Sequence, residues 1–498
     1  GVIHHKKYEG EDVKKCVIDI GPVTSSLTGN TITGDTGEGF EFLELVTQPF
    51  TWENTEKIWL RGSFDAEYLQ ANYRVRRFNK ERNSVRTFDC TQYGAEWNAS
   101  LTHYYMNVME ELDIPGEWFL DDDTGMLYIY PISDLTDAQI SVPIGDKELI
   151  AFEEGVHNVV VSNITFKGTT VSPAQVSGYR NLFQRCIVEG GFVINRGKNC
   201  GLINSKIMGG VGVNYGLNEG MESMDAQNLR PTRNFVQNNI IIGGNLGLRT
   251  GVQTILSHNT IMNSQTMCIY IAEAQESIIE YNEVVGGPAK TIDAGMIYVE
   301  GHMLNLYNHV RYNYFHHDRV EMRSMPMGVY FDDRSCNNFA YGNICQHVCM
   351  HMNGGSNNVF YNNVVLDETA NYNAMSNNGG YVTGGYASIE KAIIEGTAYS
   401  YYFNKNGYMK TAQVTWKNRY PSHYITMNKW LPMVQLEGRA PDYRRGDTMI
   451  DWIRPRNNVY KNNIIAYCKS LGEYEKIEPQ RGEIGSWFDT TYIMPDDK

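Results

Sequence analysis

One short phrase, an Asn followed by apolar residues, returns along the middle of the chain. It occurs seven times, at Asn204, Asn239, Asn259, Asn282, Asn313, Asn343 and Asn363. From Asn239 onward the intervals are 20, 23, 31, 30 and 20 residues. A short strand that returns at such a loose period is typical of stacked coils, in which each repeat buries its apolar face against its neighbours. The repeat therefore predicts a β-solenoid.

The residues around the repeat also favour an all-β fold. Short β-branched runs such as Val159–Val161, Ile240–Ile242 and Val364–Val365 are separated by Gly, Asn and Ser. No helical period of 3.6 residues competes with them. We expect the repeated Asn residues to take the left-handed conformation at the coil corners and to stack through their side chains.

The repeat divides the chain into a predicted solenoid and an accessory part. Residues 1–150 are predicted to form a β-rich N-terminal part packed on the solenoid, with a hairpin at Asp123–Gly125. Residues 151–498 are predicted to form the parallel β-helix. A Tyr- and Asn-rich stretch at about 371–455 breaks the rhythm, and the repeat returns at 457–465. We therefore expect this stretch to be a long loop insertion within one domain.

Composition limits the partners. A net charge of −14 argues against nucleic acid, which needs a basic surface. No run of 18 apolar residues occurs, so we expect no membrane span. The 9 Cys are scattered without a CxxC motif and their number is odd, which favours small buried side chains over disulfides or a metal site. The chain starts with Gly-Val-Ile, so we expect a leader or a longer N-terminal part to precede it.

Candidate chemistry emerges when successive coils are aligned. We align Tyr270, Tyr298 and Tyr330, because parallel strands of neighbouring coils lie about 4.8 Å apart. Side-chain alternation then points Ile271, Val299 and Phe331 into the coil. Glu300 and Asp332 point outward on adjacent rungs. The next coil brings His351 and Asn353 near the same file, while Asp293 precedes one of the strands and Asp333 follows Asp332.

Two carboxylates on one face suit the hydrolysis of a glycosidic bond. One acid protonates the leaving oxygen while the other attacks or directs water, and like charges this close raise one of the two pKa values. Taken singly, each acid has a plainer interpretation, because Asp often ends a strand as a turn residue and Glu300 suits an exposed strand position. The predicted substrate-binding residues are Tyr298, Tyr330, His302, Arg323, His351 and Asn353.

A metal site is not expected. The cluster His316–Asp318 offers possible ligands, but no further ligand lies at a suitable spacing, which favours a solvated corner. We therefore predict neither a metal nor another cofactor.

Several motifs together resemble a known group of enzymes. The stretch Gly116–Pro131 resembles the hairpin that precedes the solenoid in right-handed parallel β-helix glycoside hydrolases. Four further stretches resemble that group's successive coil motifs, namely Ile279–Asn282, Asp293–Tyr298, Val329–Asp333 and Gly354–Asn358. The group includes families 136 (lacto-N-biosidases) and 141 (fucosidase and xylanase activities), and the resemblance covers about residues 50–365.

The resemblance implies a secreted or surface-associated bacterial enzyme with two catalytic carboxylates on neighbouring coils. The family 136 pair is about seven positions apart, which Asp293 and Glu300 match with Glu in place of Asp. The family 141 pair is about forty apart, which Asp293 matches with Asp332 or Asp333. The chain departs from the group at Met296, where Ala is usual, and in lacking the solenoid's usual N-terminal opening. The second departure predicts a missing N-terminal part or a partner subunit.

We therefore predict a right-handed parallel β-helix that hydrolyses an oligosaccharide or complex glycan outside the cell or at its surface. Asp293 is the predicted acid/base, with Glu300 or Asp332 as nucleophile or water-directing base and Asp333 as third choice. A polysaccharide lyase is one alternative, although lyases want Lys, Arg or calcium beside a uronate and this face is acidic. A non-catalytic glycan-binding solenoid is the other.

Overall fold

The computed structural model describes residues 6–7, 39–89, 91, 102–136, 143–214, 229–316, 327–366, 375–377, 413–422, 457–466 and 487–493, apart from short gaps within these ranges. The chain divides into two compact units, Gly1–Ser141 and Val142–Lys498. The packing of the N-terminal part on the solenoid stays a prediction. Among the described residues, no helix is long and apolar enough to cross a membrane.

The first unit is an antiparallel sheet with strand order β1-β6-β3-β4-β5-β2. Its aromatic core includes Phe42, Phe64 and Tyr105, all nearly inaccessible to solvent. The predicted hairpin is present, because β7 and β8 pair antiparallel on either side of the turn. The bounds are β1 Lys6–Lys7, β2 Glu41–Leu43, η2 Gln48–Thr51, β3 Trp59–Gly62, β4 Ala71–Asn79, β5 Ser84–Thr87, β6 Thr102–Met106, η3 Met109–Glu111, β7 Trp118–Asp121 and β8 Met126–Ile129.

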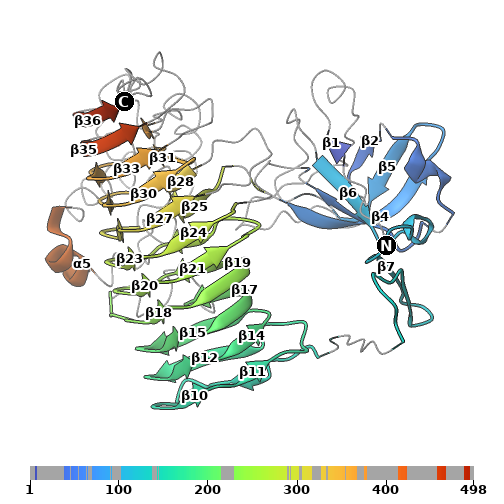
Figure 1. Ribbon diagram of the computed structural model, residues 1–498, viewed down its shortest axis with the longest axis horizontal. Helices are drawn as coiled ribbons and strands as arrows, with labels where there is room; N and C mark the ends of the chain where they lie inside the picture. Colours follow the sequence, from blue (N-terminus) through green and yellow to red (C-terminus); the bar gives the residue numbers. More distant parts are fainter. Residues whose placement is uncertain are drawn as a thin grey trace. The chain divides into compact units, whose positions relative to one another are not determined.

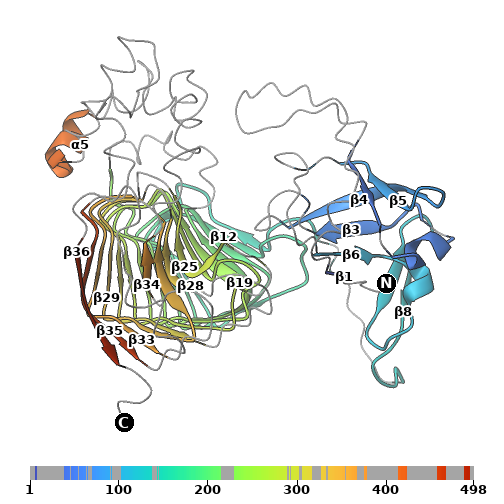
Figure 2. The ribbon, with the colours of Figure 1, turned by 90° about the horizontal axis from the view of Figure 1, so that it is seen from above.

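The second unit is the predicted right-handed parallel β-helix, whose coils stack from β10 to β36 (Figure 1). Within the described residues, 28 strands join in one continuous sheet wound into three faces (Figure 2). The bounds of the first half are β9 Ile150–Ala151, β10 Val160–Ser162, β11 Thr165–Phe166, β12 Ala174–Tyr179, β13 Leu182–Gln184, β14 Ile187–Glu189, β15 Phe192–Lys198, β16 Gly201–Ile203, β17 Lys206–Val213, β18 Phe235–Gln237, β19 Ile240–Arg249, β20 Ile255–Ser257, β21 Thr260–Met262 and β22 Ile269–Ala272.

The remaining strands continue the same three faces. They are β23 Ile278–Glu280, β24 Glu283–Val285, β25 Gly295–Val299, β26 His309–Arg311, β27 Tyr314–His316, β28 Met327–Phe331, β29 Phe339–Tyr341, β30 Ile344–Gln346, β31 Cys349–Met352, β32 Val359–Tyr361, β33 Val364–Leu366, β34 Met375–Asn377, β35 Val459–Ala466 and β36 Trp487–Ile493. Inside the coils, one apolar core includes Ile271, Val299 and Phe331. The cysteines that the structure describes are buried in the coils, namely Cys186, Cys200, Cys268, Cys336, Cys345 and Cys349.

The repeated Asn side chains form an internal ladder. The Nδ2 group of Asn343 donates to Oδ1 of Asn363 at 3.0 Å and to the carbonyl of Val310 at 2.9 Å. The backbone N–H of Asn343 donates to the same Oδ1 at 3.0 Å. Each rung thus uses both amide protons and the carbonyl oxygen of its side chain, which only Asn supplies at this length. The pattern recurs at Asn239, Asn259, Asn282 and Asn313.

The predicted left-handed conformation belongs to a different residue. It is the position before each ladder Asn that has positive φ, as at Asn238, His258, Tyr281 and Tyr312. The expectation that the ladder Asn itself takes this conformation was therefore wrong. Its side chain must point into the coil to bond its neighbours, so the corner bends one residue earlier. In the first repeat the left-handed residue is Asn204, and Ser205 takes the ladder position.

The coils contain a second Asn ladder, which was not predicted from the sequence. Asn308 donates to Oδ1 of Asn338 at 3.0 Å, and the backbone N–H of Asn338 donates to Oδ1 of Asn358 at the same distance. Asn458 continues the series as acceptor from the Asn358 backbone at 2.9 Å. Each member lies five positions before a member of the first ladder. That fixed offset was the signal available in the sequence.

The repeat returns after the long interruption, as predicted. Strand β35 pairs with β32 and β33, and Asn363 donates across 100 positions to Asn463 at 3.0 Å. Within the predicted insertion, most residues lie outside the described ranges. Of those described, β34 pairs with β31 and still belongs to the coils, so the insertion starts later than predicted, and helix α5 spans Gln413–Arg419. Arg419 donates to Glu276 at 2.6 Å, and the hydroxyl of Tyr420, the residue after the helix, donates to the same carboxylate at 3.0 Å. These contacts fix α5 to the coils.

Candidate functional site

The candidate site lies on the face built from β22, β25, β28 and β31. Tyr270 pairs with Tyr298, Tyr298 with Tyr330 and Tyr330 with His351, so the register is the one the sequence predicted. Alternation within these strands leaves the tyrosines on the outer face, where they form a small cluster with Ala272 and Met327. Because the strands hold their ends in line, the polar residues that follow each strand gather at one edge of this face.

Asp332, directly after β28, is surrounded by hydrogen-bond donors. The Tyr298 hydroxyl donates to its Oδ2 at 2.6 Å, and Asn353 Nδ2 donates to its Oδ1 at 3.0 Å. The Tyr330 hydroxyl lies 2.7 Å from the same Oδ1. Hydrogen bonds to a carboxylate favour its charged form. The arrangement therefore suits Asp332 as an ionised group held in one orientation.

Asp293 reaches the same hydroxyl from the turn before β25. It has a φ of 52°, a turn conformation that Asp tolerates, and its Oδ1 lies 2.9 Å from the Tyr330 hydroxyl. Although Asp293 as a residue is exposed, this oxygen contacts a tyrosine that is 1% exposed, so the carboxyl end lies inside the site. Burial and the nearby charge of Asp332 raise the pKa of Asp293.

One hydroxyl thus joins the two acids. Because Tyr330 lies 2.9 Å from Asp293 and 2.7 Å from Asp332, their nearer oxygens are at most the sum of these lengths, about 5.6 Å, apart. The carboxyl groups also differ in surroundings. Asp332 has three polar neighbours and Asp293 has a raised pKa, which is the asymmetry expected of one proton donor and one anion.

The groups below the acids stay neutral. Burial, together with the charge of Asp332, raises the pKa of Tyr298 and Tyr330. His351 is buried with its ring 5.0 Å from that of Tyr330, and burial lowers its pKa to about 4 despite the opposing effect of Asp332. Near neutral pH these three side chains therefore supply packing and hydrogen bonds without adding charge.

Glu300 follows β25 at the position that Asp332 occupies one rung later. Its backbone N–H donates to Ile271, as that of Asp332 donates to Val299, which keeps both in one file. Asn305 holds the carbonyl of Glu300 at 2.7 Å. Its charge contributes to the raised pKa of Tyr298. The bridging hydroxyl, however, links Asp293 with Asp332.

Other predicted site residues cannot be placed. Asp333, His302 and Arg323 lie outside the described residues, as do His317 and Asp318. His316 is described, and its Nε2 lies 3.1 Å from Glu283 while its ring stacks on Tyr314. These two contacts are with its own coil and the preceding one.

Arg249 also lies on this face, although it was not among the predicted site residues. Arg249 pairs with Ala272, which puts it in the file that continues to Glu300 and Asp332, and its guanidinium lies 5.5 Å from the centre of the Tyr270 ring. Extending the alignment back by one coil, to Leu246–Arg249, would have found it.

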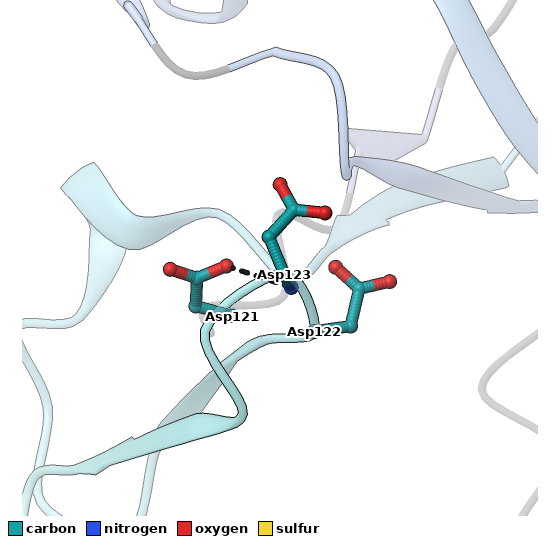
Figure 3. A group of neighbouring side chains, drawn as sticks. All are labelled: Asp121, Asp122 and Asp123. Atoms are coloured by element: carbon teal, nitrogen blue, oxygen red, sulfur yellow. Dashed lines mark hydrogen bonds between the residues drawn. The ribbon is translucent and has the colours of Figure 1, made fainter.

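A second cluster of carboxylates lies in the N-terminal unit, at the hairpin turn between β7 and β8. Among the residues that the structure describes, the carboxylates close enough to share an ion are Asp121, Asp122 and Asp123 at the hairpin turn (Figure 3). The ammonium group of Lys57 contacts all three, at 2.8 Å from Asp122 and 2.9 Å from Asp123. Lys57 lowers the pKa of Asp121 to about 2. A lysine therefore already supplies the cation here.

No protein-family model matches the chain, and no curated protein matches its sequence. Among solved structures, the chain is similar to a periplasmic alginate epimerase, with 9% identity over 64% of this chain and 70% of that chain and a TM-score of 0.34. It is also similar to a glycoside hydrolase, with 13% identity over 75% of this chain and 76% of that one and a TM-score of 0.36. Similarity this remote carries no functional information. Membership in family 136 or 141 stays a prediction.

Proposed function

We propose that the protein is a glycoside hydrolase in which Asp293 is the acid/base and Asp332 is the nucleophile. The observation that carries the proposal is the single hydroxyl between the two carboxyl groups. The Tyr330 hydroxyl joins Asp293, whose pKa is raised, to Asp332, which accepts hydrogen bonds from other donors as well. Asp293 is exposed, so solvent reaches this face. Enzymes that hydrolyse glycosides separate an acid from an anion in this way.

The proposed reaction has two steps. Asp293 gives its proton to the glycosidic oxygen while Asp332 attacks the anomeric carbon, so the glycosidic bond breaks and a glycosyl ester forms. The Asp293 carboxylate then takes a proton from water, the water oxygen attacks the same carbon, and Asp332 leaves. Two inversions at one carbon retain its configuration.

The separation of the acids supports retention. Retaining enzymes hold their carboxyl groups about 5–5.5 Å apart, and inverting enzymes about 6.5–9.5 Å apart to admit a water. An upper limit of about 5.6 Å between the nearer oxygens fits the shorter class. Asp293 and Asp332 are about forty positions apart in the sequence, the spacing that resembles family 141. This spacing favours fucosidase- or xylan-type activity over lacto-N-biosidase activity.

The charge of the site supports a neutral sugar at the point of cleavage. Glu300 lies one rung from Asp332, so a uronate placed here would meet like charges at short range. An oligosaccharide or complex glycan without a uronate at the reacting unit is the proposed substrate. Such a substrate fits a location outside the cell or at its surface, which is part of the same proposal.

The test is a screen of chromogenic glycosides together with milk and plant oligosaccharides, followed by thin-layer and mass analysis of products. We expect hydrolysis of at least one neutral glycan, and its loss in Asp293→Asn and Asp332→Asn variants that keep the wild-type circular dichroism. An ultraviolet-absorbing unsaturated product from a uronate polymer would instead identify a lyase. Saturable glycan binding without turnover over long incubation would identify a binding protein. Full activity in both variants would exclude the proposed pair.

A further inference from the structure

We infer that Tyr330 is a positioning residue that keeps one proton on the Asp293–Asp332 pair and donates its own hydroxyl proton to whichever acid is ionised. The Tyr330 oxygen lies within hydrogen-bonding distance of both acids, at 2.9 and 2.7 Å, but a hydroxyl carries one proton and can donate to only one of them. The second short contact needs a proton on the other carboxyl group.

The surrounding donors decide which acid holds that proton in the resting protein. Asp332 also accepts from Tyr298 at 2.6 Å and from Asn353 at 3.0 Å, whereas the hydrogen-bond contact of Asp293 within the described part of the chain is the one with Tyr330. The proton is therefore better placed on Asp293. Asp293 then donates to the Tyr330 oxygen, and Tyr330 donates to Asp332.

The other charged and titratable groups around Tyr330 fit this state. Tyr298 and Glu300 come from β25 and its end, and the negative charge of Glu300 contributes to the raised pKa of Tyr298, which keeps the Tyr298 hydroxyl protonated. His351, from β31, has a pKa of about 4 and so stays neutral near pH 7. Tyr330 itself is buried, and its raised pKa keeps its hydroxyl protonated.

The role of the hydroxyl reverses during the proposed reaction, on which this assignment of roles rests. In the glycosyl ester, Asp332 carries no charge and Asp293 has given up its proton to the leaving group. Tyr330 can then turn its proton from Asp332 to Asp293 and support the carboxylate that activates water. No net proton transfer to or from Tyr330 is required, so the phenol stays neutral throughout.

Removing the Tyr330 hydroxyl should change the pKa of Asp293, and the direction of that change tests whether the hydroxyl bridges the two acids. In Tyr330→Phe, the state with one proton loses both hydrogen bonds of the bridge, while the state with two charges loses only the single donation that the hydroxyl could still make. The proton should therefore leave Asp293 more easily, and its pKa should fall by about one to two units. A hydroxyl that only donated to ionised Asp293 would hold the pKa down, so its removal would raise that pKa.

The matched control is Tyr298→Phe. Tyr298 donates to Asp332 alone, and Asp332 is ionised both before and after Asp293 loses its proton. The contribution of Tyr298 to this step cancels, so the control should leave the pKa of Asp293 unchanged.

The experiment is a pH titration of the full chain labelled with ¹³C at the Asp side-chain carboxyl carbons, followed by NMR without any substrate. We expect one carboxyl group to remain protonated near pH 7 in the wild type, its signal to disappear in Asp293→Asn, its pKa to fall in Tyr330→Phe, and no change in Tyr298→Phe. A rise or no change in Tyr330→Phe would overturn the inference. If Tyr330→Phe fails to fold, the wild type still decides, because a pair that is fully ionised near pH 7 would overturn it as well. Since no turnover is measured, a shared proton in a protein without hydrolase activity would contradict only the proposed function.

Discussion

Two ladders of aromatic rings run along the β-helix, and they differ in how their rings are stacked and how far they are exposed. The corner ladder, His258, Tyr281 and Tyr312, stacks nearly parallel at 5.0 and 5.3 Å, and its tyrosines are 51% and 45% exposed. The site ladder, Tyr270, Tyr298 and Tyr330, begins in the same way, with planes 10° apart, but Tyr330 turns to 74° from Tyr298. In the corner ladder, each ring stacks on the ring of the next rung.

The site differs from the rest of the scaffold in the orientation of the Tyr330 ring, which is rotated out of the parallel stack. A parallel stack follows from placing the same residue type on successive rungs about 4.8 Å apart. At Tyr330 the ring is instead edge-on and buried, and its hydroxyl meets Asp293 and Asp332. Repetition thus accounts for the first ladder, whereas function is the better explanation where the repetition breaks.

The largest expected difference between the ladders is in turnover. Asp332→Asn and Asp293→Asn should each lower kcat/KM at least about a thousandfold, since one loses the nucleophile and the other the proton donor. Tyr312→Phe, in the corner ladder, should leave kcat/KM unchanged. Initial rates on the best substrate of the glycan screen measure both. Equal losses in all three variants would mean that the changes act through folding.

The next largest effect concerns the scaffold that carries both ladders. Asn363→Ala removes a buried side chain that accepts from Asn343 and donates to Ala340 and Asn463, each at 3.0 Å. Leaving those partners unsatisfied should lower the free energy of unfolding by about 3 kcal/mol. Asn362→Gly changes the neighbouring residue, which is exposed and has the left-handed conformation. It should lower the free energy of unfolding by well under half as much as Asn363→Ala. Chemical denaturation of the two variants gives the comparison, and equal losses would remove the ladder's special role.

A smaller effect is predicted for Asp293 as pH changes. Its folded-state pKa is raised, so its contribution to stability is fully present below the unfolded value of about 3.9 and is lost as pH rises through the folded pKa. Asp293→Asn removes this loss. The variant should match the wild type in the acid range and melt at a higher temperature at neutral and alkaline pH. A stability difference that does not change with pH would contradict the raised pKa.

The smallest effect is expected in the corner ladder itself. Tyr312→Ala removes one ring from an exposed stack and should cost about 0.5–1.5 kcal/mol, with no effect on turnover. Thermal unfolding and initial rates of the same preparation test this. A large loss of activity would show that the corner takes part in substrate binding.

Much of the fold could be predicted from the sequence because its rules are local and repeated. The alternation of apolar residues defined the outward face, and aligning three tyrosines gave the observed register. The error over the left-handed position of the Asn residues arose because two properties of Asn, turn tolerance and amide stacking, were assigned to one residue. The structure divides them between neighbours.

The site was harder to predict because it depends on side-chain directions. Asp293 lies in a turn before its strand, where alternation says nothing about its orientation, and its link to Asp332 runs through a ring that departs from the stack. From the sequence, Glu300 and Asp332 were equal candidates to accompany Asp293. The Tyr330 hydroxyl, which contacts both Asp293 and Asp332, distinguishes them.

The most direct test of the account is the configuration of the first product. Proton NMR during the first minutes of hydrolysis distinguishes the two anomers before they interconvert. Asp293 and Asp332, joined by one hydroxyl at a short separation, predict a product with the same anomeric configuration as the substrate. A product of inverted configuration would contradict the assignment of this pair as acid/base and nucleophile.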